Sequence, residues 1–161
     1  MQIFDIIKQL YRIRQAPSRP AAKIDMIVVH HDAAPPPKSG DWIARLQAYA
    51  HMHAAEGWGG IGYHYAIAPD GTTYKCNPYT RATIHAGGAN ARSIGIMLMG
   101  NFQIDHQQPT PAQLHALNDL IEALAAALPT IKHVIPHREV RQRTDCPGQY
   151  FPDAMIPHYC P

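Results

Sequence analysis

Residues 24–29 read IDMIVV, a short run in which apolar and β-branched side chains dominate. Such a run is typical of a strand that is buried on both faces of a sheet. A second run of this kind, SIGIMLM, covers residues 93–99 and is followed by Gly100. A shorter run at residues 131–135 predicts a last strand. We therefore expect three strands here, the first two of them buried.

The segments between these strands carry helix and turn signals. Residues 41–57 have apolar side chains at helical spacing behind an aspartate that can cap the helix. Residues 110–128 predict a second helix, because Thr110 and Gln113 can form a capping box around a proline at the first helical position. Residues 63–75 hold Pro-Asp-Gly between two strand-like runs, which predicts a β-hairpin.

Length and composition indicate one domain. The chain has 161 residues, of which 46% are hydrophobic and 16% are charged, so it can bury a hydrophobic core and is not a disordered chain. Three cysteines cannot all pair, which excludes a disulfide scaffold. The formal net charge of +2 does not demand a nucleic-acid partner, and we expect none. These observations predict an α/β fold, a single domain with a central mixed β-sheet flanked by helices.

The first twenty residues have a pattern of their own. Ile3, Ile6 and Leu10 have helical spacing, and four basic residues stand against one acidic residue. This pattern predicts that residues 1–20 form an amphipathic helical extension packed on the domain of residues 21–161. A helix on a membrane surface is the alternative interpretation.

No stretch of the sequence is apolar for long enough to predict a membrane-spanning helix. The N-terminus carries Asp5 and Lys8 where a secretory signal peptide needs an unbroken apolar core. We therefore expect the protein to be made in the cytoplasm without a signal peptide.

Eleven histidines, nearly as many as the twelve acidic residues, suggest metal binding or proton transfer. His133 and His137 have the i, i+4 spacing of a local helical site, but Pro136 lies between them in a predicted strand. No other neighbouring pair suits a local site, so a metal would need ligands from distant segments. The candidates at strand ends are His30, His137 and Cys146. Two histidines and one cysteine are a known open zinc set, with the fourth position left for water. On spacing alone, a plain turn at Cys146 and hydrogen-bonded structural histidines are the alternative.

Short motifs carry a more specific signal when they are taken together. In chain order they are IVVH at 27–30, HAAEGW at 53–58, IGYHY at 61–65, PDG at 69–71, HAGG at 85–88, SIGI at 93–96, TPAQ at 110–113, PHREV at 136–140 and TDCPG at 144–148. With these motifs the chain, from Ile24 to about Tyr150, resembles the type-2 N-acetylmuramoyl-L-alanine amidases. That family includes the T7-lysozyme-like phage endolysins and the peptidoglycan recognition proteins, and the resemblance implies their fold.

The resemblance also implies a zinc centre. Carried over residue by residue, the zinc ligands of the family fall on His30, His137 and Cys146, the same residues that lie at the predicted strand ends. Residues 21–161 are then expected to form a zinc amidase catalytic domain, with Zn²⁺ as its cofactor.

Four further site residues are implied by the same motifs. The catalytic tyrosine of the family falls on Tyr63, and Thr144 stands two residues before the cysteine, as in the catalytic recognition proteins. His85 and Asn90 stand where the family lines its substrate cleft. We expect Tyr63 and Thr144 to take part in catalysis, and His85 and Asn90 to bind the glycan or the stem peptide.

The implied function is cleavage of the amide between N-acetylmuramic acid and L-alanine in peptidoglycan. The resemblance, taken with the compact chain and the lack of a signal-peptide pattern, implies a monomeric phage or prophage endolysin, bacteriolytic and antimicrobial, which reaches the cell wall with the help of a holin-like partner. One alternative is a non-catalytic peptidoglycan-binding module, but binding-only members lose the cysteine that is Cys146 here. The other is a cytoplasmic amidase that recycles muropeptides, but those enzymes typically carry Asp at the third ligand and Glu at the position of Tyr63.

Overall fold

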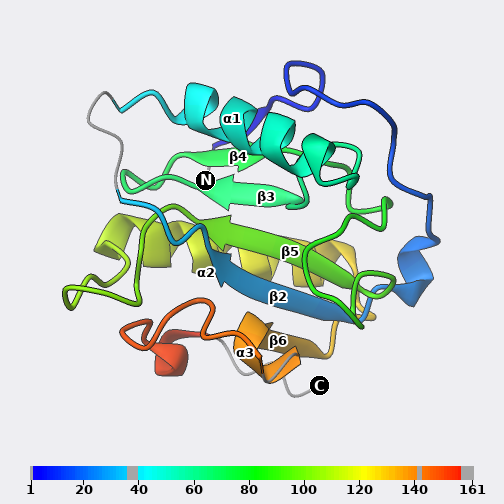
Figure 1. Ribbon diagram of the computed structural model, residues 1–161. Helices are drawn as coiled ribbons and strands as arrows, with labels where there is room; N and C mark the ends of the chain where they lie inside the picture. Colours follow the sequence, from blue (N-terminus) through cyan, green and yellow to red (C-terminus); the bar gives the residue numbers. More distant parts are fainter. Residues whose placement is uncertain (1, 36–39, 141–142, 157–161) are drawn as a thin grey trace.

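The computed structural model describes residues 2–35, 40–140 and 143–156 (Figure 1). Six strands form one sheet in the spatial order β1-β4-β3-β5-β2-β6. The strands are β1 (Ile3–Asp5), β2 (Met26–His31), β3 (Tyr65–Ile67), β4 (Thr73–Lys75), β5 (Ser93–Leu98) and β6 (His133–Pro136). The helices are α1 (Trp42–Ala55), α2 (Pro111–Ala127) and the short α3 (His137–Val140), with 3-10 turns at Ala21–Lys23 and Asp153–Met155.

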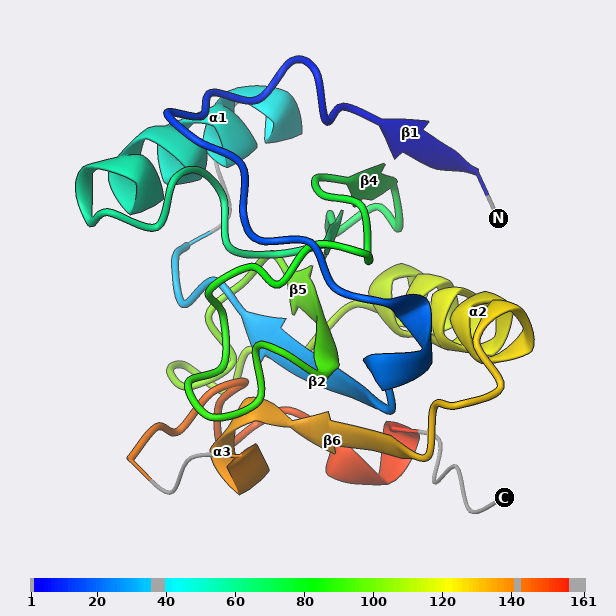
Figure 2. The same ribbon diagram turned by 90° about the vertical axis from the view of Figure 1, so that its right-hand side faces the viewer.

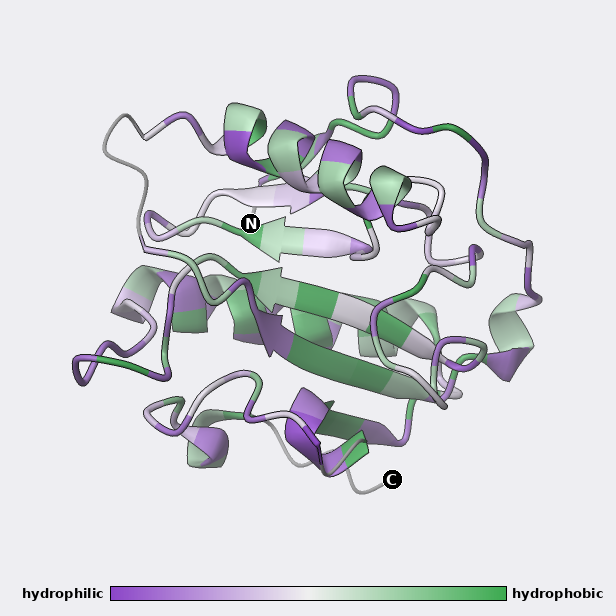
Figure 3. Ribbon diagram, in the orientation of Figure 1, coloured by the Kyte–Doolittle hydropathy of each residue, from purple (hydrophilic) through white to green (hydrophobic). Residues whose placement is uncertain are grey.

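The sheet is mixed, as the sequence predicts. The β3–β4 hairpin is antiparallel, whereas β1–β4, β3–β5, β2–β5 and β2–β6 are parallel pairs. β5 and β2 lie at the centre, and every residue of β5 is buried. Both strands are hydrophobic along most of their length, and β2 becomes hydrophilic only at its carboxyl end (Figure 3). The expected α/β domain with a central mixed sheet and flanking helices is confirmed.

The two long helices cover opposite faces of the sheet (Figure 2). Leu117 of α2 belongs to the same buried cluster as Ile96 of β5. Leu46 of α1 belongs to a second cluster, which includes the next residue of that strand, Met97. Because successive side chains of a strand point to opposite faces, one central strand supplies both halves of the core.

Both predicted helix starts are confirmed. Thr110 Oγ1 accepts a hydrogen bond from the Gln113 backbone N–H at 3.1 Å, and Gln113 Oε1 accepts one from the Thr110 N–H at 3.1 Å. These two bonds form the expected capping box, with Pro111 at the first helical position. At α1, the Asp41 carboxylate accepts a hydrogen bond from the Ala44 N–H at 2.9 Å.

The predicted amphipathic helix at the N-terminus is wrong. Residues 3–5 form strand β1, which pairs in parallel with β4, and no helix occurs within residues 2–20. Ile6 and Leu10 are nevertheless buried, and they belong to the core cluster that contains Leu46 of α1. The open edge of β4 offers backbone hydrogen bonds that a local helical pattern does not reveal, so the tertiary contact decides the conformation.

Parallel pairing places the carboxyl ends of three strands at one edge of the sheet. β2 lies between β5 and β6, and its register pairs Val29 with Ile96 and with Pro136. The residues that follow these pairs, His30 on β2 and His137 at the start of α3, therefore lie side by side. In α/β sheets this edge is where ligand sites usually form.

Among the residues that the structure describes, no helix is long and apolar enough to cross a lipid bilayer.

The burial of Leu10 makes the N-terminal segment part of the folded core. We predict that Leu10→Ala lowers the free energy of unfolding by about 2–4 kcal/mol, because it leaves a cavity beneath α1. Urea denaturation measures this change. The matched control is Ile13→Ala, at a side chain that is 58% exposed, with an expected change below about 0.5 kcal/mol. Equal effects of the two substitutions would contradict the packing of this segment.

Candidate metal centre

Three possible metal ligands meet at the carboxyl edge of the sheet. One donor atom from each of His30, His137 and Cys146 lies within 4.8 Å of the other two. The His30 and His137 rings are 4.4 Å apart between centroids, and Cys146 Sγ lies 3.8 Å from His30 Nδ1. The residues come from β2, from the first turn after β6 and from a loop 116 residues beyond His30. These three residues could hold one metal ion.

Backbone hydrogen bonds hold the Cys146 loop against this edge. The Arg138 N–H donates to the Cys146 carbonyl at 2.8 Å, and the His31 N–H donates to Cys146 Sγ at 3.4 Å. Gly148 has a φ of +108°, and a Cβ there would lie 2.4 Å from the Phe102 carbonyl oxygen. The loop can approach the chain at Phe102 only because residue 148 is a glycine.

The electrostatics of His30 and Cys146 favour their neutral forms in the absence of a cation. Burial lowers the pKa of His30 well below its usual value, and the neighbouring His85 and His137 lower it further. Burial raises the pKa of the Cys146 thiol to about 12. The hydrogen bond from the His31 backbone and the charge of Arg138 lower this pKa, but by less than burial raises it. Neutral imidazole is the form that binds metals, and metal binding releases the proton of a thiol.

Tyr63 lies beside the three ligands. Its ring is 5.2 Å from the His30 ring and 5.9 Å from the His53 ring, measured between centroids. Burial raises the pKa of the phenol above its usual value, and the charges of Cys146 and Asp32 act in the same direction. The predicted catalytic tyrosine is therefore at the site.

Thr144 is half-buried in the loop of Cys146. Its hydroxyl oxygen accepts a hydrogen bond from the Cys146 backbone N–H at 3.2 Å. The side chain therefore helps to shape the turn that presents the sulfur.

The two expected substrate-binding residues make intramolecular contacts. His85 is 7% exposed, and its Nδ1 lies 3.0 Å from His30 Nε2, so it stands directly behind a ligand. Asn90 Oδ1 accepts hydrogen bonds from the backbone N–H groups of His85 at 3.0 Å and of Ala86 at 2.8 Å. The Asn90 carbonyl in turn accepts one from the buried Arg19 guanidinium at 2.7 Å. These bonds hold the 85–90 loop in place behind the ligands.

Sequence reasoning missed Asp32, which links the carboxyl end of β2 to two other elements. Asp32 Oδ2 accepts hydrogen bonds from Arg45 Nε at 2.7 Å and from the Tyr49 hydroxyl at 3.0 Å, both on α1. Asp32 Oδ1 accepts one from the Gly100 N–H, just beyond β5, at 2.8 Å. The signal in the sequence is an acidic residue directly after a buried strand, but its partners are too distant to be recognised.

Other buried histidines belong to the scaffold. His31 Nδ1 accepts a hydrogen bond from the Phe102 N–H at 3.2 Å, and His53 Nδ1 accepts one from the Gly62 N–H at 3.2 Å. His64 Nδ1 accepts one from the Gly95 N–H at 3.0 Å. Burial lowers the pKa of His64 to about 3, so this imidazole is neutral and accepts the bond.

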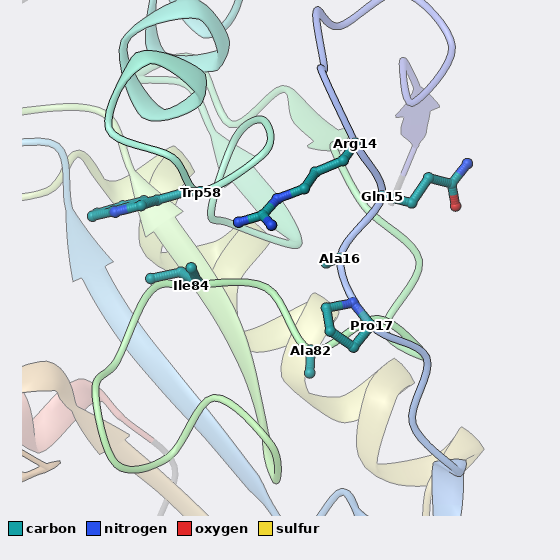
Figure 4. A pocket seen from close by; sticks show the side chains of 7 residues that line it. All are labelled: Arg14, Gln15, Ala16, Pro17, Trp58, Ala82 and Ile84. Carbon is teal, nitrogen blue, oxygen red and sulfur yellow. The ribbon is translucent and has the colours of Figure 1, made fainter.

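A pocket flanks the site on the side of Trp58 (Figure 4). Its volume is about 280 Å³, and one wall is the N-terminal segment 14–17. Trp58 and Ile84 lie across from it, and Ala82 completes the lining beside Pro17. Trp58 stacks on His53 with 4.4 Å between ring centroids, and His53 in turn contacts Tyr63. The pocket is therefore connected to Tyr63 through two aromatic contacts, and a third contact, between Tyr63 and His30, reaches the candidate ligands.

Comparisons with known proteins identify the family of the chain. Residues 20–149 match the family described as N-acetylmuramoyl-L-alanine amidase. The endolysin of Enterobacteria phage T3 is 32% identical over 113 residues, which cover 67% of this chain and 71% of the phage protein. The N-acetylmuramoyl-L-alanine amidase of Homo sapiens is 28% identical over 84% of this chain, but the chain spans only 25% of the human protein.

Solved structures show the same architecture. The endolysin amidase LysCS from Clostridium intestinale has a TM-score of 0.76 and 33% identity, with 94% of this chain and 90% of that chain covered. An ectodomain complex of the peptidoglycan recognition proteins LCa and LCx, bound to tracheal cytotoxin, has a TM-score of 0.83 at 24% identity, with 98% of both chains covered. The second likeness supports the fold alone. By the match over residues 20–149, this chain belongs to the N-acetylmuramoyl-L-alanine amidase family.

Proposed function

We propose that this protein is a zinc-dependent amidase that hydrolyses the amide between N-acetylmuramic acid and L-alanine in peptidoglycan. The observation that carries the proposal is the convergence of His30, His137 and Cys146, whose donor atoms lie within 4.8 Å of one another. Family membership supplies the substrate class. The retained cysteine favours hydrolysis over binding alone, because it completes the ligand set.

The donor set fits zinc. Imidazole nitrogens and a thiolate sulfur are ligands that Zn²⁺ prefers, and three protein ligands leave a fourth position open, as in catalytic sites. When bound there, zinc would lower the pKa of a water molecule and polarise the scissile carbonyl. His31 contributes a backbone N–H to the sulfur, which stabilises its thiolate form.

Two further side chains of the site are suited to handle protons and charge. Tyr63 is a phenol and is protonated at neutral pH, so its hydroxyl can donate a hydrogen bond to a developing oxyanion or a proton to the leaving amine. The Thr144 oxygen accepts from the Cys146 N–H, which leaves its own hydrogen available for donation toward the substrate.

We further propose that the biological role is that of a phage or prophage endolysin. The relatives named endolysin, from phage T3 and from Clostridium intestinale, support this role. An enzyme of this kind made in the host cytoplasm requires a holin-like partner to reach the cell wall. In this proposal the protein acts as a monomer on the glycan and stem peptide, and it binds no nucleic acid.

Purified peptidoglycan provides the direct test. We predict that the zinc-loaded protein releases new L-alanine amino termini without new reducing sugar ends, and that a chelator stops the release until zinc is restored. Amino-terminal labelling and a reducing-sugar assay measure the two products. Reducing ends, or activity that is insensitive to the chelator, would contradict the proposal. Binding to peptidoglycan without any product would favour a recognition module.

Cys146 tests the ligand assignment. We predict that Cys146→Ser lowers the zinc affinity and reduces turnover by at least about 100-fold, because the soft ligand is lost. Zinc content and amide cleavage are measured on the same sample. Cys76→Ala is the control: Cys76 is buried in the core cluster beneath α1, away from the candidate ligands, and this variant keeps zinc and turnover. Full activity of Cys146→Ser would refute the assignment.

Tyr63 tests the role of the phenol. We predict that Tyr63→Phe lowers kcat by about 10²–10⁴-fold, because the hydroxyl that donates to the reacting groups is removed. Zinc content stays at one ion per chain, since the hydroxyl is not among the three ligands. A variant with unchanged kcat, or one that loses its zinc, would show that Tyr63 has a different role.

A further inference from the structure

A buried chain of hydrogen bonds runs inward from the candidate ligand His30. His30 Nε2 lies 3.0 Å from His85 Nδ1, and His85 Nε2 lies 3.3 Å from Ser93 Oγ. Ser93 Oγ lies 2.8 Å from the Ala89 carbonyl oxygen. Ser93 is fully buried, and the exposed fractions of His30 and His85 are 1% and 7%.

The direction of each bond follows from counting hydrogens, starting at the inner end. The Ala89 carbonyl can only accept, so the single hydroxyl hydrogen of Ser93 is donated to it. Ser93 Oγ can then only accept from His85, which places the His85 proton on Nε2. In a neutral imidazole the other nitrogen has no proton, so His85 Nδ1 accepts from His30 Nε2.

The outer end of the chain is the nitrogen that faces the other ligands. With its proton on Nε2, neutral His30 has a lone pair on Nδ1, which lies 3.8 Å from Cys146 Sγ. Only this tautomer can coordinate a metal through Nδ1. The opposite tautomer would direct an N–H at the metal position and leave His85 Nδ1 without a donor in a buried place.

The scaffold makes specific room for the His85 ring. A Cβ at residue 95 would lie 2.6 Å from His85 Nδ1 and 2.8 Å from its Cγ, so only glycine fits beside the imidazole. Asn90 fixes the backbone of the same loop by accepting the N–H groups of His85 and Ala86. The ring is therefore held on one side by Gly95 and at its inner end by Ser93.

We propose that His85, supported by Ser93, is a positioning residue that fixes the tautomer and the orientation of His30 for zinc binding through Nδ1. This inference rests on the proposed zinc site, and it assigns His85 to the ligand rather than to the substrate. Hydrogen-bond partners of this kind typically contribute about 10- to 100-fold to metal affinity.

The first test needs neither zinc nor peptidoglycan. Long-range ¹H–¹⁵N correlation spectra of the metal-free protein at neutral pH report which ring nitrogen of each histidine carries the proton. The expected result is a proton on Nε2 of both His30 and His85. A proton on Nδ1 of either ring would overturn the proposal, whether or not the protein hydrolyses peptidoglycan.

The second test measures zinc affinity by competition with a chromophoric chelator. His85→Leu is expected to weaken zinc binding by about 10- to 100-fold, and Ser93→Ala, which perturbs the packing less, by a smaller factor. His85→Asn restores an acceptor toward His30 and is expected to recover part of the loss. His115→Leu, at an exposed histidine on α2, is the matched control and leaves the affinity unchanged.

Thermal unfolding of each variant separates a loss of affinity from a loss of fold. If folded Ser93→Ala and His85→Leu both bind zinc as tightly as the wild type, His85 does not position the ligand. If the wild type shows the expected tautomers and affinities but cleaves nothing, the positioning role stands and the proposed amidase activity fails.

Discussion

The parallel pairing of β2 with β5 on one side and β6 on the other constrains the positions of His30 and His137. Three strands that run in one direction end at one edge, so residues far apart in the chain emerge next to each other. His30 and His137 meet because Val29 is in register with Pro136. A shift of that register by one residue would turn His30 to the other face and place His31 at the site.

Burial keeps the histidines at and behind this edge of the sheet in their neutral form. Desolvation lowers the pKa of His30, His64 and His85, so the interior holds neutral imidazoles whose nitrogens must each find a partner. Backbone N–H groups and carbonyls supply several of these partners, as in the bond from Gly95 to His64 Nδ1. Such a network is costly when one member is missing, because each lost bond leaves a buried polar atom unsatisfied.

Much of this architecture is predictable from local patterns in the sequence. The runs at 24–29 and 93–99 correspond to β2 and β5, and the Thr110 capping box marks the first turn of α2. Strand ends also predict two of the three candidate ligands, His30 and His137, since a strand ends where its apolar run stops. These signals are readable because each depends on a few neighbouring residues.

Other features depend on contacts between distant segments. The spacing of apolar residues at the N-terminus is compatible with a helix, but residues 3–5 pair with the edge of β4 and form a strand. This pairing partner is distant in the sequence, so a local pattern does not predict it. The place of His85 behind His30 joins residues 55 positions apart, and the motif at 85–88 does not reveal this contact. The role of Asp32 cannot be predicted from local sequence either, because its partners Arg45 and Tyr49 lie on α1 and reach it only in the folded chain.

The region that is similar to the family and the region that folds as one unit differ at the N-terminal segment. Similarity to the family begins at residue 20, whereas the packed unit includes β1 and the side chains of Ile6 and Leu10. A fragment that begins at residue 20 would retain all three candidate ligands, yet it would expose an apolar surface beneath α1 and the unpaired backbone of β4. Exposed edges of this kind pair with other chains. The boundary set by sequence similarity would thus yield an aggregation-prone protein, and it would also remove the wall of the pocket beside Trp58.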